Sequence, residues 1–395
     1  MKKSVCIYFQ IHHPERLRKY QFFDIGKKHN YFDNYANRSE LEDLAEHCYL
    51  PANALLKELI EQYKGKFKVA FSISGSAIDQ LEMHAPEVIR SFQELAKSDC
   101  VEFLAETYSH SLASLSEDTD EFEQQVKRHT ATIKSLFGKK PVTFRNTSLI
   151  YSDEIGVRIA KLGFKTMLTD GAKHVLGWKS PNFVYKNPID ENLKLLLKND
   201  KLSDDIAVRF SERNWNEYPL TSEKFASWVD SSLADSEVLN LFMNYEVIGY
   251  YNRAESGIFE FLRYFVKQIA ENDSYQFLLP KEVVKKYEAK DVLHVPYPIS
   301  WTDEERDITS WLGNELQKEA FEELFKIQPQ VKKKKDAALS EDYSRLQASE
   351  HFYFMRTKLF SNKDYHKYHI PYDSPYEAFI NYMNVLSDFI DRLNK

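Results

Sequence analysis

The chain alternates short apolar segments with longer segments of helical periodicity, and this alternation limits the possible folds more than any other feature of the sequence. The apolar segments predict strands at residues 5–11, 67–73, 101–105, 142–144, 164–168, 206–210 and 238–243, and residues 193–197 form a further strand or a hairpin arm. Leu, Ala, Glu and Lys at helical spacing predict helices at residues 39–63, 86–96, 119–137, 152–162, 222–232 and 254–271.

Strands that alternate with helices favour a parallel sheet, and continuously apolar strands indicate a sheet that is buried on both faces. We therefore predict an α/β protein. Seven or eight such units point to a (β/α) barrel, and an open doubly wound sheet is the alternative. No G-x-G-x-x-G motif follows the first strand, which weakens the dinucleotide-binding form of that alternative.

The alternation stops near residue 296, and the remaining segments are helical. Helices are predicted at residues 302–327, 337–359 and 374–393. The expected organisation is a barrel domain of residues 1–298 followed by a helical region of residues 299–395, which caps the barrel mouth or packs on its side.

Composition excludes several classes of protein. With 43% hydrophobic residues in 395, the chain can bury a sizeable core, so it is not a disordered protein. A net charge of −7 argues against a nucleic-acid partner, which calls for a basic surplus. No apolar run approaches the ~18 residues of a membrane span. Three widely spaced cysteines do not form a disulfide scaffold, and we expect a cytoplasmic protein with free thiols.

Polar side chains follow most of the predicted strands, where (β/α) barrels carry their functional residues. Among them are His12, Glu106, His110, Arg145, Ser148, Asp170, Asn244 and Glu246, together with Ser211, Glu212 and Arg213 after the 206–210 segment. Aromatic residues are interspersed with them: Tyr108, Trp178, Trp215, Tyr245, Tyr250 and Tyr251. Polar groups and flat aromatic faces together are typical of a sugar-binding groove. Since neither an H-E-x-x-H motif nor a cysteine pair is present, we predict no metal and no other cofactor.

These strand ends resemble those of glycoside hydrolase family 57, in particular its α-amylases. The resemblance covers residues 5–14 (VCIYFQIHHP), 71–75 (FSISG), 101–108 (VEFLAETY), 144–152 (FRNTSLIYS), 240–246 (NLFMNYE), 349–355 (SEHFYFM) and 374–379 (SPYEAF). It implies an incomplete (β/α)7 barrel followed by a helical bundle. It also implies retaining chemistry on α-glucans or maltooligosaccharides without a required metal, and substrate-binding roles for His12, Glu106, His110, Arg145, Asp170 and Glu246.

Two residues depart from this resemblance at the positions that carry the chemistry. Ser148 stands where the α-amylases of the family have the nucleophilic Glu, and Asn244 stands where they have the acid/base Asp. A milder change places His13 where Gln is usual. Retaining hydrolysis needs two carboxyl groups roughly 5–5.5 Å apart. A Ser hydroxyl is short and needs an adjacent base, and an Asn amide transfers no proton at neutral pH. We therefore predict a catalytically silent protein that still binds α-glucan.

Three alternatives remain open at this stage. The first is an active, inverting hydrolase that uses Glu246, Glu106 or Asp170, since Glu246 would share a strand face with Asn244. The second is a metal-dependent deacetylase with an ion on His12, His110 and Asp170. The third is a scaffold that holds an unidentified partner enzyme through the helical region.

Overall fold

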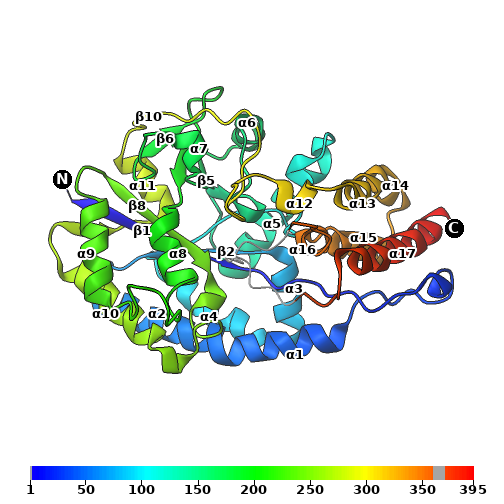
Figure 1. Cartoon of the computed structure of the whole chain (residues 1–395), viewed down its shortest axis with the longest axis horizontal. Coiled ribbons are helices and arrows are strands. Elements are labelled where there is room, and N and C mark those ends of the chain that lie inside the picture. The colour runs from blue at the N-terminus through cyan, green and yellow to red at the C-terminus, as the bar shows by residue number, and fades with distance from the viewer. Residues whose placement is uncertain (1, 359–369) are drawn as a thin grey trace.

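The computed structural model describes residues 2–358 and 370–395 and consists of a barrel with a helical bundle beside it (Figure 1). Within these residues, seven parallel strands form the barrel: β1 (Lys3–Ile11), β2 (Val69–Ile73), β3 (Val101–Phe103), β4 (Thr143–Arg145), β5 (Thr166–Thr169), β7 (Lys194–Leu197) and β8 (Val238–Asn244). Continuous parallel pairing links β3, β2, β1 and β8, and a second group links β4, β5 and β7. Single parallel bridges, Ala105 with Phe144 and Lys198 with Asn240, join the two groups into a ring. The predicted (β/α)7 barrel is therefore confirmed.

Three shorter strands lie outside the ring. β6 (Val184–Lys186) pairs antiparallel with β7, β10 (Asp291–Val292) pairs with β6, and β9 (Tyr275–Phe277) pairs with the first residues of β1. None of these three strands was predicted from the sequence.

Side chains alternate between the lumen of the barrel and its helical coat, as the two-residue period of a strand requires. In β1, Cys6 and Tyr8 join a lumenal cluster that also contains Leu168 and Phe242. Their neighbours Ile7, Phe9 and Ile11 join a larger core against the outer helices. Burial on both faces explains why these strands are continuously apolar in the sequence.

The helices of the barrel region agree largely with the sequence pattern. They are α1 (Asn34–Leu44), α2 (Leu50–Tyr63), α3 (Gly75–His84), α4 (Pro86–Ala96), α5 (Thr119–Phe137), α6 (Asp153–Lys161), α7 (Lys173–Leu176), α8 (Asp200–Ala207), α9 (Ser222–Ser232), α10 (Ile258–Glu271) and α11 (Pro280–Lys286). A π-helical turn, η2 (Ala45–Tyr49), joins α1 to α2, so the predicted helix at residues 39–63 is continuous. α3 was not predicted, although Ser74 caps it by accepting a hydrogen bond from the Ala77 amide.

One predicted strand, residues 206–210, is wrong. These residues form the end of α8 and the turn after it, because Asn199 caps a helix that buries Leu202 and Ile206. A five-residue apolar run does not distinguish the two structures by periodicity. Ser211, Glu212 and Arg213 therefore lie exposed in a turn and not at a strand end. The place in the barrel expected for this segment is occupied by β7, which lies in the segment 193–197 that was predicted as a strand or a hairpin arm.

The C-terminal residues that the structure describes are helical, as expected. The helices are α12 (Thr309–Leu312), α13 (Glu315–Lys326), α14 (Gln328–Lys334), α15 (Ala337–Leu346), α16 (Ser349–Tyr353) and α17 (Pro375–Asn394); residue 359, the predicted end of one helix, lies outside the described residues. They share one apolar core with the adjacent side of the barrel, in which Phe352 and Tyr382 join Phe144 and Met167. The bundle therefore packs on the barrel's side, and α16 reaches toward its mouth (Figure 1). The division near residue 298 stays a prediction. None of the described helices is long and apolar enough to cross a membrane.

Candidate functional site

The carboxyl ends of β1, β3 and β4 bring a buried, charged network together at the barrel mouth. Glu106, just after β3, accepts hydrogen bonds from Ser72 Oγ (2.8 Å) and from His110 Nδ1 (2.9 Å). The Arg145 guanidinium at the end of β4 lies 3.7 Å from the same carboxylate and also donates to Gln10 Oε1. Since Glu106 and Arg145 are fully buried, each charge depends on the other for compensation.

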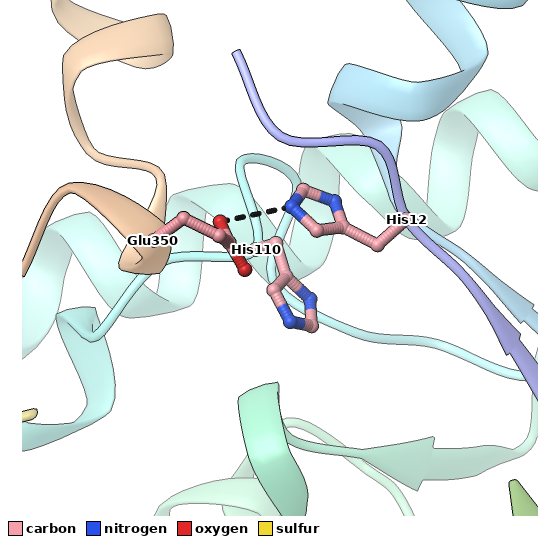
Figure 2. Close-up of side chains that lie close together, drawn as sticks. All are labelled: His12, His110 and Glu350. Carbon is pink, nitrogen blue, oxygen red and sulfur yellow. Dashed lines mark hydrogen bonds and ion pairs between the residues drawn. The ribbon is translucent and has the colours of Figure 1, made fainter. Parts of the chain in front are cut away.

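A second charged pair joins the barrel to the helical region. His12 Nε2 lies 3.0 Å from Glu350 Oε2, and His12 Nδ1 lies 2.8 Å from Ser74 Oγ. The rings of His12 and His110 stack with centroids 4.1 Å apart. Figure 2 shows that these side chains come from the loop after β1, the loop after β3 and α16. The resemblance included residue 350 in a motif, but the sequence reasoning assigned it no role.

The charge of His12 determines the state of Glu350. Burial raises the pKa of this carboxyl, but the charge and hydrogen bond of His12, together with the charge of His110, outweigh burial and hold the pKa well below its usual range. Glu350 is therefore an anion paired with histidine, and not a proton donor at neutral pH.

Ser148 and Asn244 both lie at the ends of barrel strands. Ser148 follows β4 in a left-handed backbone conformation (φ 49°, ψ 30°), which is unusual for a residue with a Cβ atom. Its hydroxyl is buried and has no hydrogen-bond partner among residues 2–358 and 370–395, and the same holds for Asn244 Oδ1 at the end of β8. Buried polar atoms are normally paired, so these two groups retain hydrogen-bonding capacity for a ligand.

Further unpaired groups lie in the lumen near these positions. Within the described part of the chain, Tyr8 Oη and both side-chain amide atoms of Asn240 are buried without a partner. Trp301 reaches the same region, because its backbone N–H donates to the Ser148 carbonyl (3.2 Å) and its ring contacts Phe242 at 5.5 Å. Trp301 takes this position because the chain returns to the barrel after β10, and no local pattern in the sequence indicates that return.

Asp170 lies in a different buried group from the two histidines. Arg306 lies 3.9 Å from Asp170 and 3.6 Å from Asp200, and Lys198 lies 3.3 Å from Asp200. Burial and the charge of Asp200 raise the pKa of Asp170, against the opposing effect of Arg306 and Lys198. The ligand set expected for a deacetylase, His12 with His110 and Asp170, is not formed by the described residues; the two histidines lie with Glu350 instead.

Glu246 does not share a strand face with Asn244. β8 ends at Asn244, and Glu246 lies in the 3-10 turn η5 (Tyr245–Val247), where Tyr49 donates to its carboxylate at 2.6 Å. The two-residue alternation of a strand therefore does not apply to it. Burial raises the pKa of Glu246 to about 7, although the hydrogen bond from Tyr49 opposes the rise.

This pKa predicts that Glu246 makes stability depend on pH. Between the ordinary value of 4.5 and about 7, the folded protein binds more protons at this site than the unfolded chain, so the free energy of unfolding falls as pH rises. The total loss is about 3 kcal/mol. Urea denaturation of the wild type and Glu246→Gln across this range should show nearly equal stability at the acidic end and a relative loss in the wild type above it. A constant difference between the two proteins would contradict the prediction.

The aromatic residues expected to bind sugar are placed differently. Trp178 is 93% exposed, and Tyr245 is buried in the core between the strands and the outer helices, where its ring packs on Phe9 and Phe71. Trp215 packs against Trp228. Sequence position near a strand end therefore did not identify Trp301, which joins the lumenal cluster of Tyr8 and Phe242.

Comparison with known proteins gives the same architecture and a family. The chain is 39% identical to the "Putative alpha-amylase" of Methanocaldococcus jannaschii over 96% of this chain and 83% of that protein. The branching enzyme TK1436 of Thermococcus kodakaraensis has a similar fold, with a TM-score of 0.68 at 12% identity over 90% of this chain and 86% of that one. The 4-alpha-glucanotransferase of Thermococcus litoralis has a TM-score of 0.65 at 15% identity over 89% of this chain, which spans 56% of that enzyme.

The model of the family Glycosyl hydrolase family 57 matches residues 6–296, which include the strands of the barrel ring apart from the first residues of β1. Together with the identity to the Methanocaldococcus protein over nearly the full chain, this match establishes the family. The chain belongs to glycosyl hydrolase family 57 and is an α-amylase-like member of it.

Proposed function

We propose that this protein binds an α-glucan or a maltooligosaccharide at the barrel mouth and does not hydrolyse it efficiently. The observation that carries the proposal is the pair of neutral residues, Ser148 and Asn244, at the two strand ends where the family resemblance expects carboxylates. General acid–base help contributes about 10²–10⁴-fold to a rate. Loss of a nucleophile costs on the order of 10⁶-fold. Either substitution alone would nearly abolish turnover.

The geometry supports sugar binding at the same place. Ser148 Oγ, Asn244 Oδ1 and Tyr8 Oη are buried polar atoms that have no partner in the described residues, and sugar hydroxyls both donate and accept hydrogen bonds. Trp301, whose backbone N–H donates to Ser148, adds an aromatic ring that packs on Phe242. Relatives named as an α-amylase, a branching enzyme and a 4-alpha-glucanotransferase support an α-glucan as the ligand.

Binding and turnover are tested together on the purified full chain. Calorimetry with maltooligosaccharides and glycogen should show binding, while a reducing-end assay of the same mixtures should show no product. Asn244→Ala should weaken binding, because it removes an unpaired buried amide; Asn192→Ala, which changes an exposed turn, is the matched control. Turnover within a hundredfold of a typical glycosidase, abolished by Glu246→Gln or Glu106→Gln, would contradict the proposal.

A second candidate is an inverting hydrolase with reassigned carboxyl groups. The observation that favours this candidate is that burial raises the pKa of Glu246 to about 7. A carboxyl group with such a pKa can donate a proton near neutral pH. Against it, Tyr49 holds this carboxylate, and both Glu106 oxygens are engaged by Ser72 and His110. Turnover that inverts the anomeric configuration and disappears in Glu246→Gln would support this candidate over the first.

The location of the protein, the division of its chain and a partner of its helical region are three further points. We propose a cytoplasmic location, which the three free, buried cysteines support because thiols persist in a reducing compartment. The division of the chain into residues 1–298 and 299–395 is supported by the family match, which ends at residue 296. A protein partner of the helical region would be sought by co-purification.

A further inference from the structure

We propose that His12, His110 and Glu350 form a binding site for a divalent transition-metal ion of the zinc class. One ligand atom from each residue lies within 4.8 Å of the other two, and all three residues are buried. Figure 2 shows the His12 ring directed at the Glu350 carboxylate and the His110 ring lying close to both side chains. The three ligands do not include Ser148 or Asn244, and zinc binding can be tested in the absence of a glucan.

The donor atoms are those that zinc prefers. Imidazole nitrogen and carboxylate oxygen bind Zn²⁺ at about 2.0–2.2 Å, so two ligands of a tetrahedral ion lie about 3.3 Å apart. His12 Nε2 and Glu350 Oε2 are already 3.0 Å apart. Bringing all three ligand atoms within bonding distance of one ion therefore requires side-chain movement, chiefly of His110.

The surroundings orient both histidines as ligands. Ser74 Oγ holds His12 Nδ1 at 2.8 Å, and the Glu106 carboxylate holds His110 Nδ1 at 2.9 Å. A metal-binding histidine typically donates its other ring N–H to an oxygen in this way, which fixes the tautomer and leaves Nε2 for the ion. Gln10 Nε2 lies 3.0 Å from His110 Nε2, so this amide must turn aside when an ion binds.

The local charge also accommodates a cation. Two carboxylates, Glu106 and Glu350, and one guanidinium, Arg145, are buried here, and Arg145 lies 3.7 Å from Glu106. A divalent cation bound by the three ligands would add positive charge beside the Glu350 carboxylate.

Such an ion would have a defined position in the fold. It would join the loop after β1, the loop after β3 and α16, and would thus connect the helical region to the barrel mouth. Three protein ligands leave a fourth position for water or for a hydroxyl group of a bound sugar.

The test uses the full chain after treatment with a chelator. Titration with zinc chloride, followed by calorimetry, should show one equivalent bound, and Co²⁺ should give the visible absorption of a protein-bound ion. Glu350→Gln and His12→Gln should weaken zinc binding at least a hundredfold. Glu350→Asp should retain most of it, and His174→Gln, which changes an exposed histidine, should leave it unchanged.

Folding is monitored in the same samples. Zinc should raise the thermal midpoint of the wild type and of His174→Gln and should leave that of Glu350→Gln unchanged. If His12→Gln does not fold, the comparison of Glu350→Gln with Glu350→Asp decides the question. The inference is overturned if the folded wild type binds no zinc, or if Glu350→Gln binds zinc as tightly as the wild type, as an adventitious surface ion would.

Discussion

Introducing carboxylates at both positions, in a Ser148→Glu/Asn244→Asp variant, is expected to give this protein measurable hydrolysis of α-glucosidic bonds, at least about 10²-fold above the wild type. The new Glu supplies a nucleophile at the end of β4, and the new Asp supplies an acid and base at the end of β8. The left-handed backbone at Ser148 is already in place and fixes the direction of the new side chain. Reducing ends released from maltooligosaccharides measure the gain.

The matched control is Ser148→Gln/Asn244→Asp, because Gln has the shape of Glu without its charge and cannot act as the nucleophile. Each single variant should remain close to the wild type, since retaining hydrolysis needs both groups. An inactive double variant that still binds maltooligosaccharide would contradict the claim that these two positions alone set activity.

Removal of the Arg145 guanidinium in Arg145→Met should lower the free energy of unfolding by about 3–5 kcal/mol. The guanidinium is fully buried, lies 3.7 Å from the equally buried Glu106 and lies over the Phe242 ring at 5.1 Å. Its loss leaves a carboxylate in the interior without its cation. Urea denaturation monitored by tryptophan fluorescence measures the change.

Arg263→Met on α10 is the control, because its pair with Glu58 is on the surface and such pairs contribute about 1 kcal/mol or less. The double variant Glu106→Gln/Arg145→Met should regain part of the lost stability, since it also removes the orphaned charge. A loss at Arg145 no larger than that at Arg263 would contradict the prediction.

The barrel could be predicted largely from the sequence. Six of its seven strands coincide with predicted strands, and the seventh, β7, was recognised as either a strand or a hairpin arm. The error at residues 206–210 arose because a short apolar run fits a buried helix end as well as a buried strand. In the folded protein, the cap formed by Asn199 and the burial of Leu202 stabilise the helix.

The candidate site could be predicted only in part. Glu106, His110, His12 and Arg145 meet as expected, because the carboxyl ends of neighbouring parallel strands lie at one rim. Asp170 and Glu246 also follow strands, but their side chains enter other groups, with Arg306 and Tyr49 respectively. A residue that follows a strand lies at the rim of the barrel, but this position does not determine which side chains it contacts.

The sequence by itself determined the parallel α/β ring of this protein and the neutral side chains, a hydroxyl at residue 148 and an amide at residue 244, at the ends of two of its strands. Only the tertiary structure decided that Glu350 pairs with His12, since 338 residues separate the two and the pairing depends on how the helical bundle packs on the barrel. Local periodicity reports which face of an element is buried. It carries no information about the partner from a distant segment, which is set by the packing of whole elements.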